Sequence, residues 1–222
     1  SAVAVVALLA GAGVLGQQFR QGQEEKIEPP AGASGPGRLA LPGEAVTPPV
    51  TVTIYQDLRS RASRAFAEEY GDTLDAMAAT GQVRLEYRLV TETDARLGGR
   101  GATEAANAAA CAQDEGHFTD YVDVLWRNQP DEHDDAFASQ RHLSKLAEQV
   151  PGIDPAVFRP CVKVRKHQGW VQASQREFSA SGLGEVPVLT IGDRVVRPDS
   201  SLTPVKLRKL VRQAVRDSGL DW

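Results

Sequence analysis

Apolar and polar residues alternate in two different periods after residue 50. Residues 50–56 alternate β-branched or aromatic residues with polar ones, which is the period-two signature of a strand. The apolar positions of residues 63–79 recur at helical spacing, and residues 83–90 alternate again. A strand, a helix and a second strand in this order predict a right-handed parallel crossover.

The middle of the chain predicts helices only. Residues 104–114 are rich in alanine, residues 118–127 are amphipathic, and residues 142–149 carry leucines about one helical turn apart. One further helix is expected to begin near Pro160, because proline suits the first turn, and to run past Phe178 to glycine stop signals. These helices form an insertion at about residues 100–181.

The chain closes with a predicted hairpin and helix. Residues 188–191 and 194–196 flank a Gly-Asp turn, and residues 203–218 carry an amphipathic helical pattern. The full order is therefore strand-helix-strand, helical insertion, hairpin and helix. This order predicts an α/β protein, specifically a thioredoxin fold with an inserted helical subdomain over residues 50–222.

The residues before 50 have a different composition. Residues 2–16 carry no charge, and a bilayer span needs about 20 apolar residues, so we expect residues 1–20 to be the visible part of a membrane anchor. A signal-peptide core is the alternative. Residues 21–49 are rich in proline and glycine and are expected to be a linker that packs no core.

Composition narrows the classes of function. The 222 residues carry a formal net charge of -4, with basic and acidic residues interspersed, so nucleic acid is not an expected partner. The two cysteines, Cys111 and Cys161, match no CxxC or metal-ligand spacing, and neither a metal nor a cofactor is expected. Outside the cytoplasm they are free to pair; two unpaired buried cysteines are the alternative.

The first predicted strand and helix resemble the active-site entrance of DsbA-like oxidoreductases. In that family a strand ends in an aromatic residue, a spacer, an aspartate, an apolar residue and one more position before Cys-Pro-x-Cys. Tyr55, Asp57 and Leu58 stand in this order, and Arg59 holds the last position. The family's redox motif is replaced here by Ser60, Arg61, Ala62 and Ser63.

Two further segments are similar to the same family. Residues 182–196 look like the family's loop that ends in a cis-proline and opens a hairpin, with Val186 before Pro187. The helical insertion has an actinobacterial-looking DsbA-like pattern, with Cys111 and a partner near Cys161. The resemblance covers residues 50–218, and it implies a cis Val186-Pro187 bond and a structural Cys111–Cys161 bridge.

Serine cannot replace the redox cysteine chemically. Disulfide exchange needs a thiolate, whereas a serine hydroxyl needs an adjacent general base to become a nucleophile. All four histidines fall in the predicted helical region, away from Ser60 in sequence, so we expect Ser60 and Ser63 to be helix caps and no catalytic residue at this turn. An acidic, His-containing segment at residues 131–135 is interpreted as a solvated loop.

These features predict a single-pass protein of the cell membrane whose folded domain lies outside the cytoplasm. Its expected function is that of a redox-inactive thioredoxin-like module that binds a protein partner or supports a membrane-associated complex. The alternative is a DsbA-like thiol-disulfide oxidoreductase, either active through Cys111 and Cys161 or engineered from cysteine to serine. Engineering is disfavoured because the motif's proline is also missing, replaced by Arg61.

Overall fold

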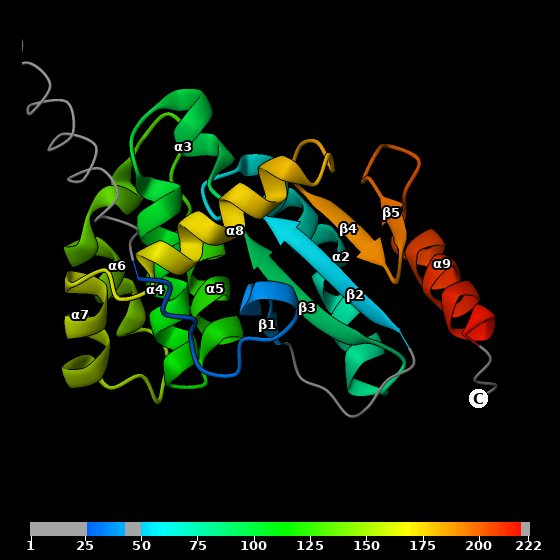
Figure 1. The fold of residues 1–222 in the computed structure, drawn as a ribbon, viewed down its shortest axis with the longest axis horizontal. Coiled ribbons are helices and arrows are strands. Elements are labelled where there is room, and N and C mark those ends of the chain that lie inside the picture. Colours follow the sequence, from blue (N-terminus) through cyan, green and yellow to red (C-terminus); the bar gives the residue numbers. More distant parts are fainter. Residues whose placement is uncertain (1–25, 43–49, 219–222) are drawn as a thin grey trace, which may run out of the picture.

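The computed structural model describes residues 26–42 and 50–218. A five-stranded sheet runs through its centre in the order β1-β3-β2-β4-β5 (Figure 1). The β2 and β3 strands are parallel, and the other neighbouring pairs are antiparallel. The strands are β1 (Leu41–Pro42), β2 (Thr51–Gln56), β3 (Arg84–Leu89), β4 (Val188–Ile191) and β5 (Arg194–Val196).

Helices cover both faces of this sheet and form a second body beside it (Figure 1). The α2 and α9 helices pack on one face, α8 contacts β3 from the other, and α4 to α7 build the helical body. The helices are α2 (Arg61–Ala79), α3 (Glu92–Leu97), α4 (Gly101–Asp114), α5 (Phe118–Arg127), α6 (Gln140–Ala147), α7 (Pro155–Lys163), α8 (Gln168–Ala180) and α9 (Pro204–Asp217). The predicted thioredoxin fold with an inserted helical subdomain is confirmed.

The period-two pattern of β2 distributes its side chains between the two faces. Val52, Ile54 and Gln56 are buried, and the first two belong to the core formed with α2 and α9. Tyr55 points to the opposite face, where its ring lies 5.5 Å from that of Phe178 on α8. The central strand is therefore covered on both sides, as its mixture of β-branched and aromatic residues predicts.

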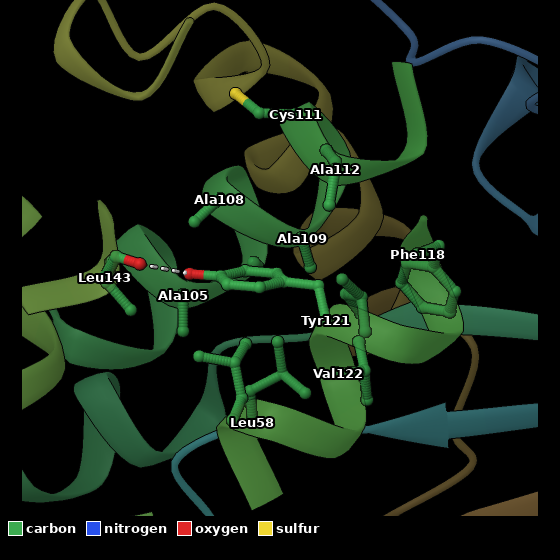
Figure 2. Close-up of a cluster of buried hydrophobic side chains, with 14 of the residues drawn as sticks. Leu58, Ala105, Ala108, Ala109, Cys111, Ala112, Phe118, Tyr121, Val122 and Leu143 are labelled. Atoms are coloured by element: carbon green, nitrogen blue, oxygen red, sulfur yellow. Dashed lines mark hydrogen bonds between the residues drawn. The ribbon is translucent and has the colours of Figure 1, made fainter. Parts of the chain in front are cut away.

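The helical body has a core of its own (Figure 2). Small side chains along α4, including Ala105 and Ala109, let neighbouring helices approach closely. The Tyr121 hydroxyl is buried with them and donates to the Leu143 carbonyl at 3.0 Å, which satisfies the one polar atom of that side chain. Cys111 lies in the same core, one turn along α4 from Ala108.

The single helix expected from Pro160 to Phe178 is wrong, because the structure has two helices there. The α7 helix already begins at Pro155, capped by the Asp154 side chain, so Pro160 lies inside it. The chain then turns at Arg165, which has a left-handed φ of 52°, before α8 begins. The break places His167 in the interior, where its backbone N–H donates to the Asn107 side chain at 2.9 Å.

The prediction that residues 21–49 pack no core is wrong for residues 26–42. Leu39 and Leu41 are buried in the core of the helical body, and β1 pairs with β3. Trp170 also donates its indole N–H to the Arg38 carbonyl at 2.8 Å. Composition alone gave the wrong prediction for this segment. Its few apolar residues are brought together by turns and pack against distant helices and β3.

The membrane expectation concerns a part of the chain that the structure leaves undescribed. Residues 1–20, where an anchor is expected, lie outside the described ranges. Within residues 26–42 and 50–218, no helix is both long enough and apolar enough to cross a bilayer.

Candidate functional site

Ser60 and Ser63 form the amino-terminal turn of α2, where the sequence places the equivalent of the redox motif. The Ser60 side chain caps the helix by accepting from the Ser63 N–H at 3.3 Å. The Ser63 hydroxyl accepts from the Asp57 N–H at 3.1 Å. Both serines are buried, so their hydroxyls serve the local fold, and the capping role expected for Ser60 is confirmed. The capping role expected for Ser63 is wrong, because Ser63 lies inside α2 and its hydroxyl binds the Asp57 N–H instead.

Residues 128–135 close over this turn. Glu132 lies at the amino terminus of α2, where its carboxylate accepts from the Arg61 N–H at 2.6 Å. The Gln129 amide donates to the Leu58 and Ser60 carbonyls at 2.9 and 3.1 Å. The interpretation of residues 131–135 as a solvated loop is therefore wrong for Glu132, because the positive end of the helix dipole attracts its carboxylate.

Arg59 joins three segments from the interior of the same turn. Its side chain is 2% exposed and forms ion pairs with Asp94 and Asp135, each at 3.0 Å. It also donates to the backbone carbonyls of Gly98 at 2.7 Å and Glu132 at 3.1 Å. The turn, the start of the helical insertion and the loop that covers the turn are thus tied to one cation.

Asp57 is a buried carboxyl between β2 and α2. Its two oxygens accept from the backbone N–H groups of Arg59 at 2.8 Å and Thr93 at 2.7 Å. Burial nevertheless outweighs these bonds and raises the pKa of Asp57 to about 6. The folded protein therefore binds a proton at Asp57 at pH values where the unfolded chain has lost it.

Replacing Asp57 by asparagine is expected to change how stability depends on pH. Because the pKa is raised in the folded state, wild-type stability should fall as pH rises from 4 to 6, by roughly 3 kcal/mol at this site. Urea unfolding of Asp57→Asn between pH 4 and 7 should show no such decline in the free energy of unfolding. The variant should also be less stable than wild type by a pH-independent amount, because the hydrogen bond from Thr93 is lost. The exposed Asp193→Asn is the control; parallel curves for wild type and Asp57→Asn would contradict the raised pKa.

The loop at Val186 and Pro187 lies at the same end of β2. The Val186-Pro187 bond is cis, as the resemblance implies, and Val188 pairs with Tyr55. The Val186 N–H bonds to the carboxylate of Glu92, next to Thr93, whose N–H binds Asp57. The structure therefore brings the serine turn and the cis-proline loop together through the start of α3.

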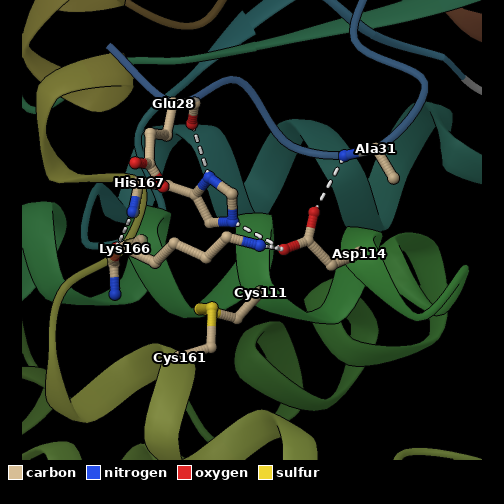
Figure 3. The surroundings of a disulfide bond; sticks show 8 residues. Glu28, Ala31, Cys111, Asp114, Cys161, Lys166 and His167 are labelled. Carbon is tan, nitrogen blue, oxygen red and sulfur yellow. Dashed lines mark hydrogen bonds and ion pairs between the residues drawn. A yellow bond between two sulfur atoms is a disulfide. The ribbon is translucent and has the colours of Figure 1, made fainter. Parts of the chain in front are cut away.

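Cys111 and Cys161 form a disulfide between α4 and α7, as expected (Figure 3). Cys111 is 1% exposed, whereas Cys161 is only partly buried. The bridge is remote from the serine turn. Asp94 links the turn to the start of α4, because it binds both Arg59 and the Ala102 N–H. Cys111 lies nine residues beyond Ala102, which is about 14 Å along the helix axis. The two candidate regions are separate.

His167 lies beside this disulfide and is fully buried. One of its ring nitrogens and the two cysteine sulfurs lie within 4.8 Å of one another. Nδ1 faces the Glu28 carbonyl at 2.6 Å, and Nε2 faces an Asp114 carboxylate oxygen at 2.9 Å (Figure 3). Both ring nitrogens of His167 therefore face oxygen atoms, one from the backbone and one from a carboxylate.

Asp114 is the acidic partner of His167. Its carboxylate lies 2.9 Å from the His167 ring and accepts from Lys166 at 2.6 Å and from the Ala31 N–H at 2.9 Å. Burial works against ionisation, but these three partners outweigh it and lower the pKa of Asp114. The disulfide therefore lies next to a hydrogen-bonded His167–Asp114 pair, and no spacing in the sequence indicates that these two residues meet there.

The two cysteines and His167 form the one group within the described ranges whose donor atoms are close enough together to hold a metal ion. In the disulfide neither sulfur offers a thiolate, which is the form that binds zinc. The cluster in this state is better described as a disulfide with a buried histidine neighbour.

A family model described as thioredoxin matches residues 43–213. The chain belongs to the thioredoxin family. Among curated protein sequences, none matches this thioredoxin-family chain.

Several solved structures share the fold of this family member. Reduced DsbG from Mycobacterium tuberculosis has a TM-score of 0.68 at 21% identity, covering 84% of this chain and 95% of its own. Oxidised BdbD from Bacillus subtilis has a TM-score of 0.69 at 16% identity, covering 85% of this chain and 100% of its own. Oxidised Mtb DsbA has 0.67 at 21% identity, with coverages of 79% and 92%. At these identities the likeness establishes the fold.

The expectation of a redox-inactive accessory module is corrected by these findings. That expectation rested on the loss of cysteines at residues 60–63, but the chain carries its disulfide elsewhere, between Cys111 and Cys161. The solved structures that share its fold include DsbA and DsbG, so the accessory-module reading is set aside in favour of the oxidoreductase alternative, which is taken up as a proposal.

Proposed function

We propose that this chain is a thiol-disulfide oxidoreductase whose redox group is the Cys111–Cys161 disulfide. The observation that carries the proposal is the position of His167 next to both sulfurs. The chain has two cysteines in all, so any thiol exchange that it performs must use this pair. The likeness to DsbG, described as a disulfide bond oxidoreductase, supports the same class of reaction.

Exposure decides which sulfur a substrate reaches first. Cys161 is only partly buried as a residue, whereas Cys111 is 1% exposed, although both sulfurs belong to a buried cluster. We therefore expect a substrate thiolate to attack the Cys161 sulfur. The Cys111–Cys161 bond breaks, its electron pair leaves on Cys111, and a mixed disulfide forms between Cys161 and the substrate. A second substrate thiolate then attacks the substrate sulfur of the mixed disulfide and releases Cys161. Two electrons and two protons pass from the substrate to the protein.

The departing Cys111 thiolate needs a positive neighbour. Both cysteines stand near the carboxyl ends of their helices, Cys111 in α4 and Cys161 in α7, where the helix dipole disfavours negative charge. The helix effect that activates cysteine at an amino terminus is therefore missing, and the His167 ring next to the sulfurs is the group that would offset the negative charge when it carries a second proton. Leaving groups with a lower pKa depart faster, so His167 should set the rate.

Single-turnover exchange tests the proposal. Oxidised protein mixed with an equimolar reduced dithiol peptide should oxidise about one peptide per chain, as the balance above requires. His167→Gln should slow this reaction by tenfold or more, which is about the cost of losing a charged partner. The stoichiometry of the reaction should not change. Mass spectrometry of acid-quenched samples measures both the peptide and the protein.

Trapping variants separate the roles of the two cysteines. Cys111→Ser leaves Cys161 free to form a lasting mixed disulfide with an oxidised peptide, whereas Cys161→Ser leaves only the buried Cys111 and should form little. The double variant Ser60→Ala and Ser63→Ala is the control and should retain exchange. Exchange that occurs only after denaturation would show that the bridge is structural and would overturn the proposal.

The same proposal includes location and partner. Disulfides persist in oxidising compartments, which supports a domain outside the cytoplasm, attached to the membrane through the anchor expected at residues 1–20. The partner would be a protein that presents thiols to Cys161. Protease protection in intact cells tests the location, since an extracytoplasmic domain is digested without lysis.

A further inference from the structure

A groove of about 370 Å³ lies between α2 and α5, over the face of the sheet that carries Ile54. It is separate from the disulfide and from the serine turn, since neither cysteine and neither serine lines it. Its volume falls in the range of small-molecule sites. The question is which chemistry its walls would recognise.

Gln56 provides a buried donor without a partner in this groove. Its side chain lines the groove and is 3% exposed, and its amide nitrogen has no hydrogen-bond acceptor. The alternation along β2 places Gln56 on the same face as Ile54, beneath α2. A buried amide without a partner is costly, so an oxygen of a ligand at this position would gain a hydrogen bond.

The rim of the groove is acidic. The groove is lined by Asp120 and Asp123 from α5 and by Asp75 from α2, which already has an interaction of its own. Among the residues that the structure describes, no lysine, arginine or histidine lines the groove. Asp120 has a partner in His117 at 3.4 Å, and burial raises the pKa of Asp123, with Arg127 as the opposing influence. Two helices thus present carboxylates to the same opening, which favours a cation there.

Aromatic rings and a glycine shape the space between the acidic rim and Gln56. Tyr87 and Phe118 line it with their ring centroids 5.4 Å apart. Gly71, in the middle of α2, also lines the groove, and a Cβ added there would meet no atom within 4 Å. The wall is therefore open where an ordinary helical residue would fill it.

We propose that this groove binds a small amphipathic amine. Its ammonium group would lie at Asp123, its apolar body against Tyr87 and Phe118, and an oxygen at its far end would accept from the Gln56 amide. This site is independent of the thiol chemistry, because it uses neither cysteine.

Tyramine is a suitable probe, since it carries an ammonium group, a ring and a hydroxyl in this order. Isothermal titration of the oxidised full chain should show binding that weakens about tenfold for p-cresol, which lacks the charge, and for phenethylamine, which lacks the oxygen. A peptide with an amino-terminal tyrosine presents the same groups, so comparing it with tyramine distinguishes a free amine from a protein terminus as the source.

Variants test the walls one at a time. Gly71→Leu fills the open space and should abolish binding while keeping the fold, because leucine favours a helix interior more than glycine does. Gln56→Leu should bring the affinity for tyramine to that for phenethylamine, and Asp123→Asn should weaken tyramine more than p-cresol. Asp72→Asn, an exposed α2 residue outside the groove, is the matched control and should bind as wild type does.

Two results would overturn the proposal. Tyramine that binds no more tightly than p-cresol would show that the carboxylates recognise no cation. Unchanged tyramine binding in a folded Gly71→Leu protein, with helix content and melting confirmed by circular dichroism, would place the ligand elsewhere. Because the disulfide stays intact throughout, neither result bears on thiol exchange.

Discussion

Replacing Arg59 by methionine should lower the free energy of unfolding by about 3 to 5 kcal/mol, the cost of breaking a buried ion pair. The guanidinium is 2% exposed and holds Asp94, Asp135 and two backbone carbonyls. Its removal takes the donor from two carbonyls and the cation from two carboxylates, which then keep only their uncharged donors, chiefly backbone N–H groups. Urea unfolding monitored by circular dichroism measures the loss.

Arg61→Met is the matched control for this experiment. Arg61 is two residues away and also pairs with an aspartate, Asp131 at 2.6 Å, but its side chain is 70% exposed. Exposed ion pairs contribute about 0 to 1 kcal/mol, so this variant should unfold within that margin of wild type. Equal effects at Arg59 and Arg61 would contradict the assignment of Arg59 as the cation that joins the turn, the insertion and the covering loop.

Removing both cysteines should cost about 4 kcal/mol. The Cys111–Cys161 bridge closes a loop with a sequence separation of 50, and the chain-entropy account gives this value for a loop of that length. The double variant Cys111→Ala and Cys161→Ala also keeps the helical body free of unpaired thiols. Thermal unfolding should show a large downward shift of the midpoint, since native domains are stable by only about 5 to 15 kcal/mol.

Wild-type protein reduced with dithiothreitol is the control for this second prediction. It has the same open chain as the double variant, so the two should unfold within about 1 kcal/mol of each other. A double variant as stable as the oxidised wild type would show that α4 and α7 hold together without the bridge. That outcome would leave thiol exchange at Cys161 possible but remove the structural role of the bond.

Local sequence patterns determined most of the strands and helices, and the family resemblance added two special bonds. The alternation in residues 50–56 and 83–90 specifies strands because a pleated strand exposes successive side chains to opposite faces. Ser60 caps α2 because a serine before a helical run satisfies a free backbone N–H. The cis Val186-Pro187 bond and the Cys111–Cys161 pairing were expected from the family resemblance, because the periodicity of apolar residues predicts neither.

The tertiary structure alone decided what the polar residues do. Arg59 meets Asp94, 35 positions away, and Glu132 reaches the start of α2 from 71 positions away. His167 lies beside the disulfide only because the helix is interrupted at Arg165, where the sequence predicts one continuous helix. Hydrophobic spacing reports which face of an element is buried, but the charge and proton at a buried polar group depend on partners that distant segments supply. For this reason the sequence predicted the fold of this protein and the pairing of its cysteines, whereas only the folded chain placed a buried histidine beside them.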